Sequence, residues 1–227
     1  VRERAWRGMQ ESTWDYVRSA FADRAIIVPR AWYLSPIESE KAFIDLYMPQ
    51  NGKRSFVHGI VGFHHNESLV TPINSCLKAG RFFSLHERNV VLLPDKLANL
   101  LGIDIDEVGT AQVRIFEDLY RVIGILDSGK LGKLTDLDGE LLTPVDTVKD
   151  AGLIAREATE DPRTKATAPL ENFNHILPEN TLFLPYQQVV DMEGQIRSIA
   201  LATPTQRGTE FIKAIESFMT RVALTLF

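Results

Sequence analysis

The stretch that decides the fold runs from residue 89 to residue 126 and reads NVVLLPDKLANLLGIDIDEVGTAQVRIFEDLYRVIGIL. Its first residues, 89–93, form an apolar run that is typical of a buried strand. Pro94 suits the first turn of a helix and Gly102 suits the position just after the last turn, so a short helix is predicted between them. A buried strand that leads directly into a helix indicates a fold that mixes α and β structure.

Two hairpins are predicted around this strand and helix. The first has arms over 42–48 and 54–63, and the Asn-Gly pair at 51–52 is a strong signal for the turn between them. The second spans 112–126 and turns at 117–118. Its second arm is largely apolar, so we expect that arm to be the more buried one.

The outer parts of the chain alternate between helices and strands. Apolar residues near a spacing of 3.6 predict an amphipathic helix over 2–22. The other predicted elements are a short strand at 25–28 that Pro29 stops, a strand at 181–184, a helical turn at 185–190, a strand at 196–201, a helix that Thr205 caps and that runs to about Arg221, and a final strand. We expect an exposed loop at 127–140, and 161–169 is the most linker-like segment.

This order of elements predicts an α+β fold in a single domain of residues 1–227. Helix–strand units lie at both ends and hairpins lie between them. We therefore expect an outer α+β subdomain built from residues 1–75 and 180–227, with a strand-rich subdomain of residues 76–179 inserted into it.

Composition excludes several classes of protein. Of 227 residues, 44% are hydrophobic and 24% are charged, which argues against disorder and against collagen-like or coiled-coil repeats. The net charge of −5 leaves no basic footprint for nucleic acid, and the single Cys76 rules out an intrachain disulfide framework. No run approaches the roughly 20 apolar residues of a spanning helix. The chain starts at Val1 without a methionine and ends at Phe227 in an apolar run, so we expect a piece of a longer protein.

The most tempting candidate for a metal site is His64-His65-Asn66-Glu67, with His58 or His86 nearby. The spacing does not match a metal-binding helix motif, and adjacent strand residues point to opposite faces. A solvated loop at the end of a strand explains these residues better, and a metal-dependent hydrolase remains the weaker alternative.

Other candidate residues fit structural roles better than chemical ones. Asp136–Glu140 resembles the start of a calcium loop but lacks the required ligands, so a polar turn is expected. Serine and cysteine nucleophiles lack an elbow motif or a partner, the glycines do not compose a phosphate-binding loop, and the paired acids are expected to be surface charges. The residues considered were Ser12, Ser35, Ser55, Ser217, Cys76, Gly59, Gly62, Gly129, Gly132, Asp104 and Asp106. The aromatic runs Trp32-Tyr33-Leu34 and Phe82-Phe83 are expected to pack internally. We predict no catalytic, cofactor-binding or metal-binding residue.

Several motifs in the right order resemble one family. They are Gly80-Arg81-Phe82-Phe83, Glu87 to Leu93, the Lys96–Gly102 helix, the hairpin from Val113 to Leu126, Phe183-Leu184-Pro185-Tyr186 and Ile196–Leu201. Over residues 55–203 the chain is similar to the MacB-like periplasmic core domains of FtsX-like ABC transporter permeases. Residues 1–54 match less well, and the stretch 127–180 is longer than the family pattern.

The resemblance implies an extracytoplasmic domain, tethered to the cell membrane in the full-length protein. Its outer subdomain would be porter-like and its work mechanical: ATP-driven motion of membrane helices would become export or extraction of a substrate. The implied partners are a second permease copy, a separate ABC ATPase and a periplasmic adaptor or lipoprotein. The domain itself would be no enzyme and would need no cofactor, and the isolated chain would be mostly monomeric. A binding module for a lipid, peptide or lipoprotein is the alternative.

Overall fold

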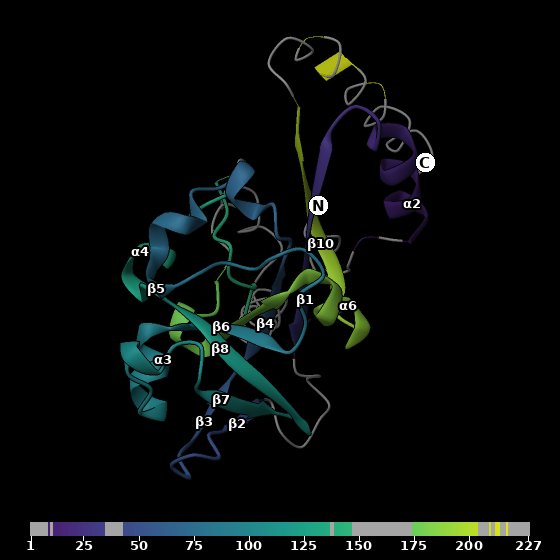
Figure 1. Ribbon diagram of the computed structural model, residues 1–227. Coiled ribbons are helices and arrows are strands. Elements are labelled where there is room, and N and C mark those ends of the chain that lie inside the picture. Colours follow the sequence, from purple (N-terminus) through teal and green to yellow (C-terminus); the bar gives the residue numbers. More distant parts are fainter. Residues whose placement is uncertain are drawn as a thin grey trace, which may run out of the picture.

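The protein is described here from a computed structural model in which residues 11–34, 43–136, 139–146 and 174–203 are placed, together with residues 9, 209, 212, 213 and 217. The fold is α+β, as predicted, with a large mixed sheet and a few short helices (Figure 1). Within the described residues no helix is both long and apolar enough to cross a membrane.

The predicted elements that lie within the described residues occur in the predicted order, and a strand at 77–80 and a short helix at 128–131 occur in addition. The α-helices are α2 (Glu11–Phe21), α3 (Asp95–Leu101), α4 (Ser128–Leu131) and α6 (Tyr186–Asp191). The strands are β1 (Ile26–Leu34), β2 (Ile44–Tyr47), β3 (Arg54–Val57), β4 (Gly59–Phe63), β5 (Leu77–Gly80), β6 (Val90–Pro94), β7 (Gln112–Ile115), β8 (Asp118–Leu126), β9 (Thr181–Pro185) and β10 (Gln195–Ala202). Short 3-10 helices are η1 (Glu67–Leu69), η2 (Ile73–Cys76), η3 (Ile105–Glu107) and η5 (Pro178–Asn180).

The sheet closes on itself because β3 and β4, which stand at different places in the strand order, are almost one continuous strand. Its order is β10-β1-β4-β9-β6-β8-β7-β2-β3, with β5 paired to β8. Only His58 separates β3 from β4, so the path that leaves β4 through β9 returns to the same strand at β3. We call the strands β4, β9, β6, β8, β7, β2 and β3 the closed sheet.

The closed sheet surrounds the main apolar core. Strands β4, β6 and β9 are buried at every residue, and the core draws side chains from all seven strands of the closed sheet as well as from α3. Each fully buried Val, Leu, Ile or Phe side chain contributes roughly 1.5–3 kcal/mol. The largest members are Ile44, Leu46, Met48, Ile60, Leu93, Leu97, Leu101 and Tyr120. The closed sheet is therefore held chiefly by apolar burial.

Strands β1 and β10 form a two-stranded ribbon that extends beyond the closed sheet (Figure 1). They pair antiparallel from Ile26↔Ala202 to Trp32↔Gln195, and β1 joins the closed sheet by pairing with β4 from Arg30 onward. Helix α2 packs Val17 and Phe21 against the ribbon to form a small separate core. Within the described residues, α2 thus packs on the ribbon and β4 ties the ribbon to the rest of the sheet.

Three predicted boundaries are wrong. Strand β1 does not stop at Pro29, because this proline lies where β1 pairs with β10 alone, and the missing N–H is tolerated beside a single neighbour. The predicted arm 54–63 breaks at His58 and its two halves pair with different strands. Residues 127–140 are not simply an exposed loop, because α4 buries Ser128 and Leu131.

Several predictions of local structure are confirmed. Helix α3 ends at Gly102, which adopts φ of 68°, and the second arm of the 112–126 hairpin is the more buried one. The linker-like segment 161–169, the cap at Thr205 and the final strand lie outside the described residues. The division into residues 1–75 plus 180–227 and 76–179 stays a prediction.

Candidate functional site: the Arg30 network and its pocket

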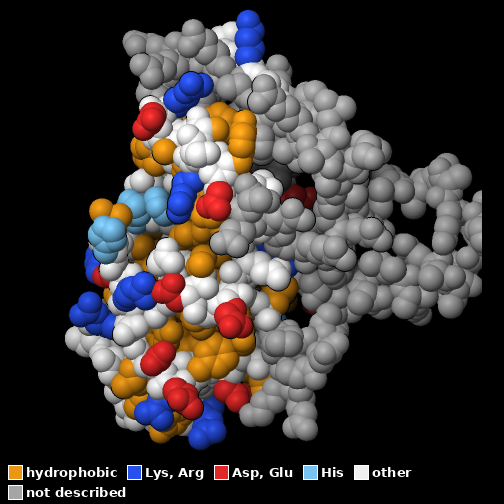
Figure 2. All heavy atoms as spheres, turned by 90° about the vertical axis from the view of Figure 1, so that its right-hand side faces the viewer, with side chains coloured by type: hydrophobic (Ala, Val, Ile, Leu, Met, Phe, Trp, Pro, Cys, Tyr) orange, Lys and Arg blue, Asp and Glu red, His pale blue; other side chains and the backbone are white. Residues whose placement is uncertain are grey.

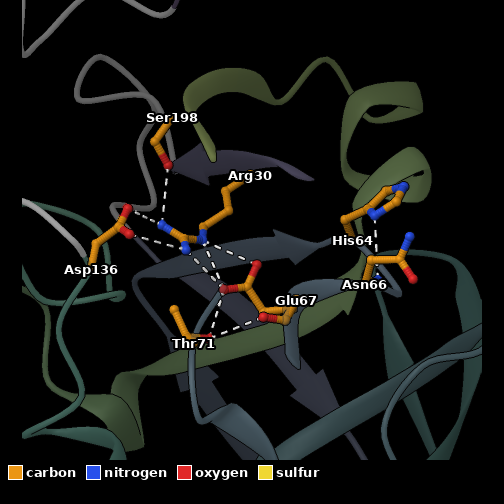
Figure 3. Close-up of polar contacts among 7 residues, drawn as sticks. All are labelled: Arg30, His64, Asn66, Glu67, Thr71, Asp136 and Ser198. Carbon is orange, nitrogen blue, oxygen red and sulfur yellow. Dashed lines mark hydrogen bonds and ion pairs between the residues drawn. The ribbon is translucent and has the colours of Figure 1, made fainter. Parts of the chain in front are cut away.

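The most unusual feature of the structure is a buried arginine on β1. The Arg30 side chain is 3% exposed, and its guanidinium meets two carboxylates from distant parts of the chain (Figure 3). Arg30 Nε and Nη2 donate to Glu67 Oε1 at 3.1 and 2.9 Å. Arg30 Nη1 donates to the Asp136 carboxylate and, at 3.4 Å, to Ser198 Oγ. These contacts connect β1, η1, the segment after α4 and β10.

Glu67 is the deepest member of this group. It is 0% exposed, and Thr71 Oγ1 donates a 2.9 Å hydrogen bond to its Oε1 atom. A buried carboxylate is tolerated only when its charge is paired and hydrogen-bonded, and Arg30 and Thr71 meet both conditions. We call Arg30, Glu67, Thr71, Asp136 and Ser198 the Arg30 network.

The network holds Arg30 in its charged form. Burial alone would lower the pKa of Arg30, but the hydrogen bonds and charges of Glu67 and Asp136 outweigh burial and raise it. A group that stays charged and fully bonded is a poor acid or base. The arrangement therefore ties four segments of the chain together.

A pocket of about 210 Å³ lies beside the network. Its apolar wall consists of Trp32, Leu141, Leu142 and Val145, and its polar lining consists of Arg30, Asp136, Glu140, His175, Arg197 and Ser198. Glu140 Oε2 lies 2.9 Å from His175 Nε2, and His175 Nδ1 lies 2.6 Å from the Thr143 carbonyl oxygen. Pockets with apolar walls and a few fixed polar groups are typical of small-molecule sites.

A β-bulge shapes one side of this pocket. In the β1–β10 ladder Arg30 pairs with Ser198 while Ala31 pairs with Ile196, so Arg197 is an extra residue with no position opposite it. Adjacent residues of a regular strand point to opposite faces, whereas a bulge can re-aim one of them. Arg197 and Ser198 consequently line the same pocket, and the Arg197 guanidinium lies 5.3 Å from the centre of the Trp32 ring.

The sequence prediction missed this site entirely. Residues 64–67 were expected to be a solvated loop, which is wrong for Glu67, because the Arg30 ion pair draws it into the interior. Arg30 and Glu67 are 37 residues apart, and Arg30 and Asp136 are 106 apart. The sequence signal that could have indicated a buried ion pair was the charged residue Arg30 inside the apolar run of β1.

The histidines that were weighed as metal ligands do not come together with the Glu67 carboxylate. The rings of His64 and His65 lie 4.1 Å apart, but the Glu67 carboxylate is held by Arg30 and faces away from the His64 ring (Figure 3). The Asn66 N–H donates to His64 Nδ1 at 3.3 Å, while burial and then the charge of His65 lower the pKa of His64 to about 4. His58 instead packs against Phe56. Among the described residues no group of three or more ligands could hold a metal ion.

The other histidine considered for a metal, His86, is exposed. Its charge lowers the pKa of His65 further, after burial. Figure 2 shows histidine side chains gathered on one part of the face that it views, with hydrophobic side chains beside them.

The remaining candidates occupy structural positions. Cys76 is buried, and burial raises the pKa of its thiol, which disfavours the thiolate that nucleophilic attack requires. Asp104 caps η3 and Asp106 is exposed. Gly139 N–H donates to the Asp136 carbonyl in the predicted polar turn, while the Asp136 carboxylate belongs to the Arg30 network. Ser35 lies outside the described residues.

The aromatic runs pack internally, as predicted. Trp32 and Phe82 lie against a second apolar cluster, which includes Phe63 and Phe183. Tyr33 lies against the main core, and Phe83 is buried. Gly59 and Gly62 belong to β4, Gly129 belongs to α4, and Gly132 follows that helix. They serve strand packing and a helix end, not a phosphate-binding loop.

Comparison with known proteins identifies the fold. The sequence matches no protein-family model, and no curated protein is significantly similar to it. Among solved structures, the periplasmic region of MacB from Actinobacillus actinomycetemcomitans overlays with a TM-score of 0.53 at 12% identity, covering 96% of this chain and 76% of that one. The chain has the fold of the MacB periplasmic region. This confirms, at the level of fold, the resemblance that the sequence motifs indicated.

A second solved structure with a similar outline is the extracellular domain of the noncanonic ABC-type transporter YknZ from Gram-positive bacteria. Its TM-score is 0.47 at 11% identity, and the overlay covers 89% of this chain and 78% of that one.

Proposed function

We propose that this chain is the extracytoplasmic domain of an ABC transporter permease subunit. In this role it transmits ATP-driven motion of membrane helices to the export or extraction of a substrate at the outer face of the membrane. The observation that carries the proposal is the MacB periplasmic fold, which extends over 96% of the chain. Because fold alone does not determine function, the proposal needs a direct test.

The proposal assigns the chemistry to other parts of the transporter. ATP hydrolysis belongs to a separate ATPase, and a second permease copy completes the transporter. A periplasmic adaptor or lipoprotein is a further proposed partner. The domain itself does mechanical work and carries no catalytic residue.

The positions of the ribbon and of the Arg30 network are compatible with a domain that transmits motion. The ribbon projects from the closed sheet, and Arg30 lies where β1 begins to pair with β4 (Figure 1). Through Glu67 and Asp136 the same side chain also holds the two segments that follow β4 and α4. A displacement of the ribbon would therefore be passed to the closed sheet through a strand and a buried ion-pair cluster, not through a loop.

The first experiment tests location and partners. An epitope is inserted at Gly52, in the exposed hairpin turn, in cells that encode the protein. The proposal expects the epitope in the membrane fraction, where added protease can cleave it from the outer side of the cell membrane. It also expects an ABC ATPase to co-purify with the epitope. A cytosolic, protease-protected epitope would overturn the proposal.

The second experiment tests transmission. In the reconstituted transporter, Asp136→Asn removes one charge from the Arg30 network and leaves the Arg30–Glu67 pair. We expect transport to fall while basal ATP hydrolysis continues. Arg88→Gln, which breaks an exposed pair with Asp191, is the matched control and should change neither rate. Equal transport by the Asp136→Asn variant and the wild type would remove the network from the proposed mechanism.

A second candidate function is a binding module for a lipid, peptide or lipoprotein at the membrane surface. The pocket beside the Arg30 network favours it, because its lining combines apolar and charged side chains. The two candidates differ in partners: a binding module needs no ATPase, so the co-purification above separates them.

A further inference from the structure

Strands β8, β7, β2 and β3 of the closed sheet share an exposed face, which lies far from the free end of the ribbon (Figure 1). Along these strands exposed side chains alternate with buried ones, and the buried ones belong to the main apolar core. We call six exposed residues of these strands the arginine face. The strand register aligns four of them in one row, and two more lie two positions along their strands, on the same side. The row is Leu119-Arg114-Tyr47-Arg54, and the flanking residues are Arg121 on β8 and Phe56 on β3.

Tyr47 lies between two arginines of this face. Arg54 on β3 and Arg114 on β7 are its partners in the two neighbouring strands. Their guanidinium carbons lie 5.2 and 5.8 Å from the centre of the Tyr47 ring. A guanidinium that lies over an aromatic ring is oriented by the ring and keeps its N–H donors for other partners. The face therefore presents two oriented guanidinium groups whose carbons are no more than about 11 Å apart, the sum of these two distances.

The acidic side chains near the arginine face do not neutralise these two groups. Asp45 is exposed on the same side of β2, and Glu117 and Asp118 lie at the turn between β7 and β8. Among the described residues, however, Arg54 and Arg114 form no ion pair with a carboxylate. The whole chain carries a net charge of −5, so a cluster of arginines is not a consequence of a basic composition. The arrangement is complementary to a negatively charged partner.

The apolar members of the face favour a protein as that partner. Phe56 is 51% exposed and lies 5.2 Å from the ring of Phe43, which is itself 36% exposed, and Leu119 is 41% exposed. Arginine, tyrosine and phenylalanine are enriched in the buried centres of protein interfaces. Membrane surfaces are instead recognised by clusters of about four to eight basic residues. The negative net charge of this chain would also oppose its approach to anionic lipid.

We propose that the arginine face docks an acidic segment of a partner protein. Two carboxylates of the segment accept hydrogen bonds from the guanidinium groups of Arg54 and Arg114, and an apolar side chain of the same segment packs against Phe56. Because the two guanidinium groups are close together, the carboxylates belong to residues a few positions apart in the partner. The proposal does not rest on the transport function, since the face is a property of the described strands.

The test titrates the isotope-labelled 227-residue chain with the acetylated peptide Glu-Glu-Phe-Glu-Glu-Leu and follows the backbone amide resonances by NMR. We expect saturable shifts at Tyr47, Arg54 and Arg114 with a Kd on the order of 1 mM, because each exposed ion pair contributes little. The same peptide with glutamine in place of each glutamate should bind roughly tenfold more weakly. Raising the salt concentration from about 0.05 to about 0.5 M should weaken binding of the acidic peptide severalfold.

Two double variants make the result specific to this face. Arg54→Gln/Arg114→Gln should weaken binding of the acidic peptide roughly tenfold, because it removes both guanidinium groups. Arg18→Gln/Arg24→Gln is the matched control, because it removes the same charge from two exposed arginines in α2 and in the turn before β1. Arg18, like Arg114, lies over an aromatic ring, that of Trp14 at 6.0 Å. The control variant should bind as the wild type does, and the amide spectra show whether both variants are folded.

Three results with the peptides would overturn the proposal. The first is the absence of saturable shifts at about 10 mM acidic peptide, well above the expected Kd. The second is equal binding of the glutamine peptide. The third is a folded Arg54→Gln/Arg114→Gln variant that binds the acidic peptide as tightly as the wild type does.

Two further results would assign the face to a different occupant and would equally overturn the proposal. Binding to phosphatidylglycerol vesicles that requires Arg54 and Arg114, without binding of the peptide, would identify a membrane surface. A wild-type dimer in analytical ultracentrifugation that Arg54→Gln/Arg114→Gln abolishes would identify a second copy of the chain. None of these results bears on the membrane location or on the ATPase, so failure of this proposal would leave the proposed transport function standing.

Discussion

The closed sheet and the ribbon lie in one sheet but are stabilised differently. Strands β6 and β9 of the closed sheet are buried along their whole length, whereas β10 of the ribbon is buried only at Ala200. Near the junction of the two regions the interior holds a charged residue, Arg30, and its ion pairs take the place of apolar packing. Apolar contacts are non-directional, while buried ion pairs demand fixed geometry. The closed sheet is therefore held by apolar burial, whereas the ribbon is attached to it beside a buried ion pair of fixed geometry.

The largest expected effect tests the apolar side of this contrast. Phe183 on β9 is 0% exposed and stacks on Phe63 with 5.3 Å between ring centroids. Phe183→Ala should lower the free energy of unfolding by about 3–5 kcal/mol, because it leaves a cavity in the core. Ile26→Ala in the ribbon, where the side chain is 45% exposed, is the control and should cost less than about 1 kcal/mol. Urea denaturation measures both free energies of unfolding. Equal losses in the two variants would show that the closed sheet and the ribbon do not differ in apolar stabilisation.

A second prediction concerns the ion pairs at the junction. Glu67→Gln removes the buried charge that faces Arg30, and the free energy of unfolding should fall by about 3 kcal/mol. The exposed pair Arg88–Asp191, with side chains 58% and 41% exposed, supplies the control, and Arg88→Gln should cost less than about 1 kcal/mol. If urea denaturation gives the two variants equal stability, the Arg30 network is not the attachment of the ribbon.

A smaller effect is expected where β4 approaches helix α6. A Cβ atom on Gly62 would lie 2.9 Å from Val189 Cβ and 3.1 Å from Tyr186 Cα, so the helix would have to move. Gly62→Ala should therefore cost about 1–3 kcal/mol in a thermal or urea melt. Gly129→Ala in α4 is the control: its Cβ would approach only Asp127 Oδ1, at 3.3 Å, and stability should hardly change. A neutral Gly62→Ala variant would show that α6 packs loosely on the closed sheet.

The last prediction concerns pH and gives the most modest effect. The pKa of His64 is lowered to about 4 in the folded protein, by burial first and His65 second, and returns to near 6.5 in the unfolded chain. Between these values the unfolded chain binds more protons, so the stability due to neutral His64 is complete above about pH 6.5 and is lost as the pH falls toward 4. Urea midpoints of wild type and His64→Gln at several pH values isolate this contribution. A constant difference between the two proteins over that range would contradict it.

Local structure was predictable from sequence where the signals were local. Pro94 and Gly102 mark the two ends of helix α3, and Asn51-Gly52 marks the turn between β2 and β3, because caps and turns depend on residues a few positions apart. The order of motifs from Gly80 to Leu201 pointed to the fold that the MacB periplasmic region shares. The errors fell where a neighbouring strand changed the local rule, as at Pro29, whose missing N–H matters little beside a single partner strand.

The amino-acid sequence by itself thus determined most of the elements, their order and the α+β class, since each depends on periodicity and on residues close together in the chain. Only the tertiary structure decided the closure of the sheet at His58, the Arg30 network and the position of Arg197 over Trp32. The side chains that Arg30 contacts lie 37 to 168 residues from it along the chain, and the Arg197 bulge exists only in the register between β1 and β10. Contacts at such separations follow from how the chain folds in space, and no local pattern encodes them.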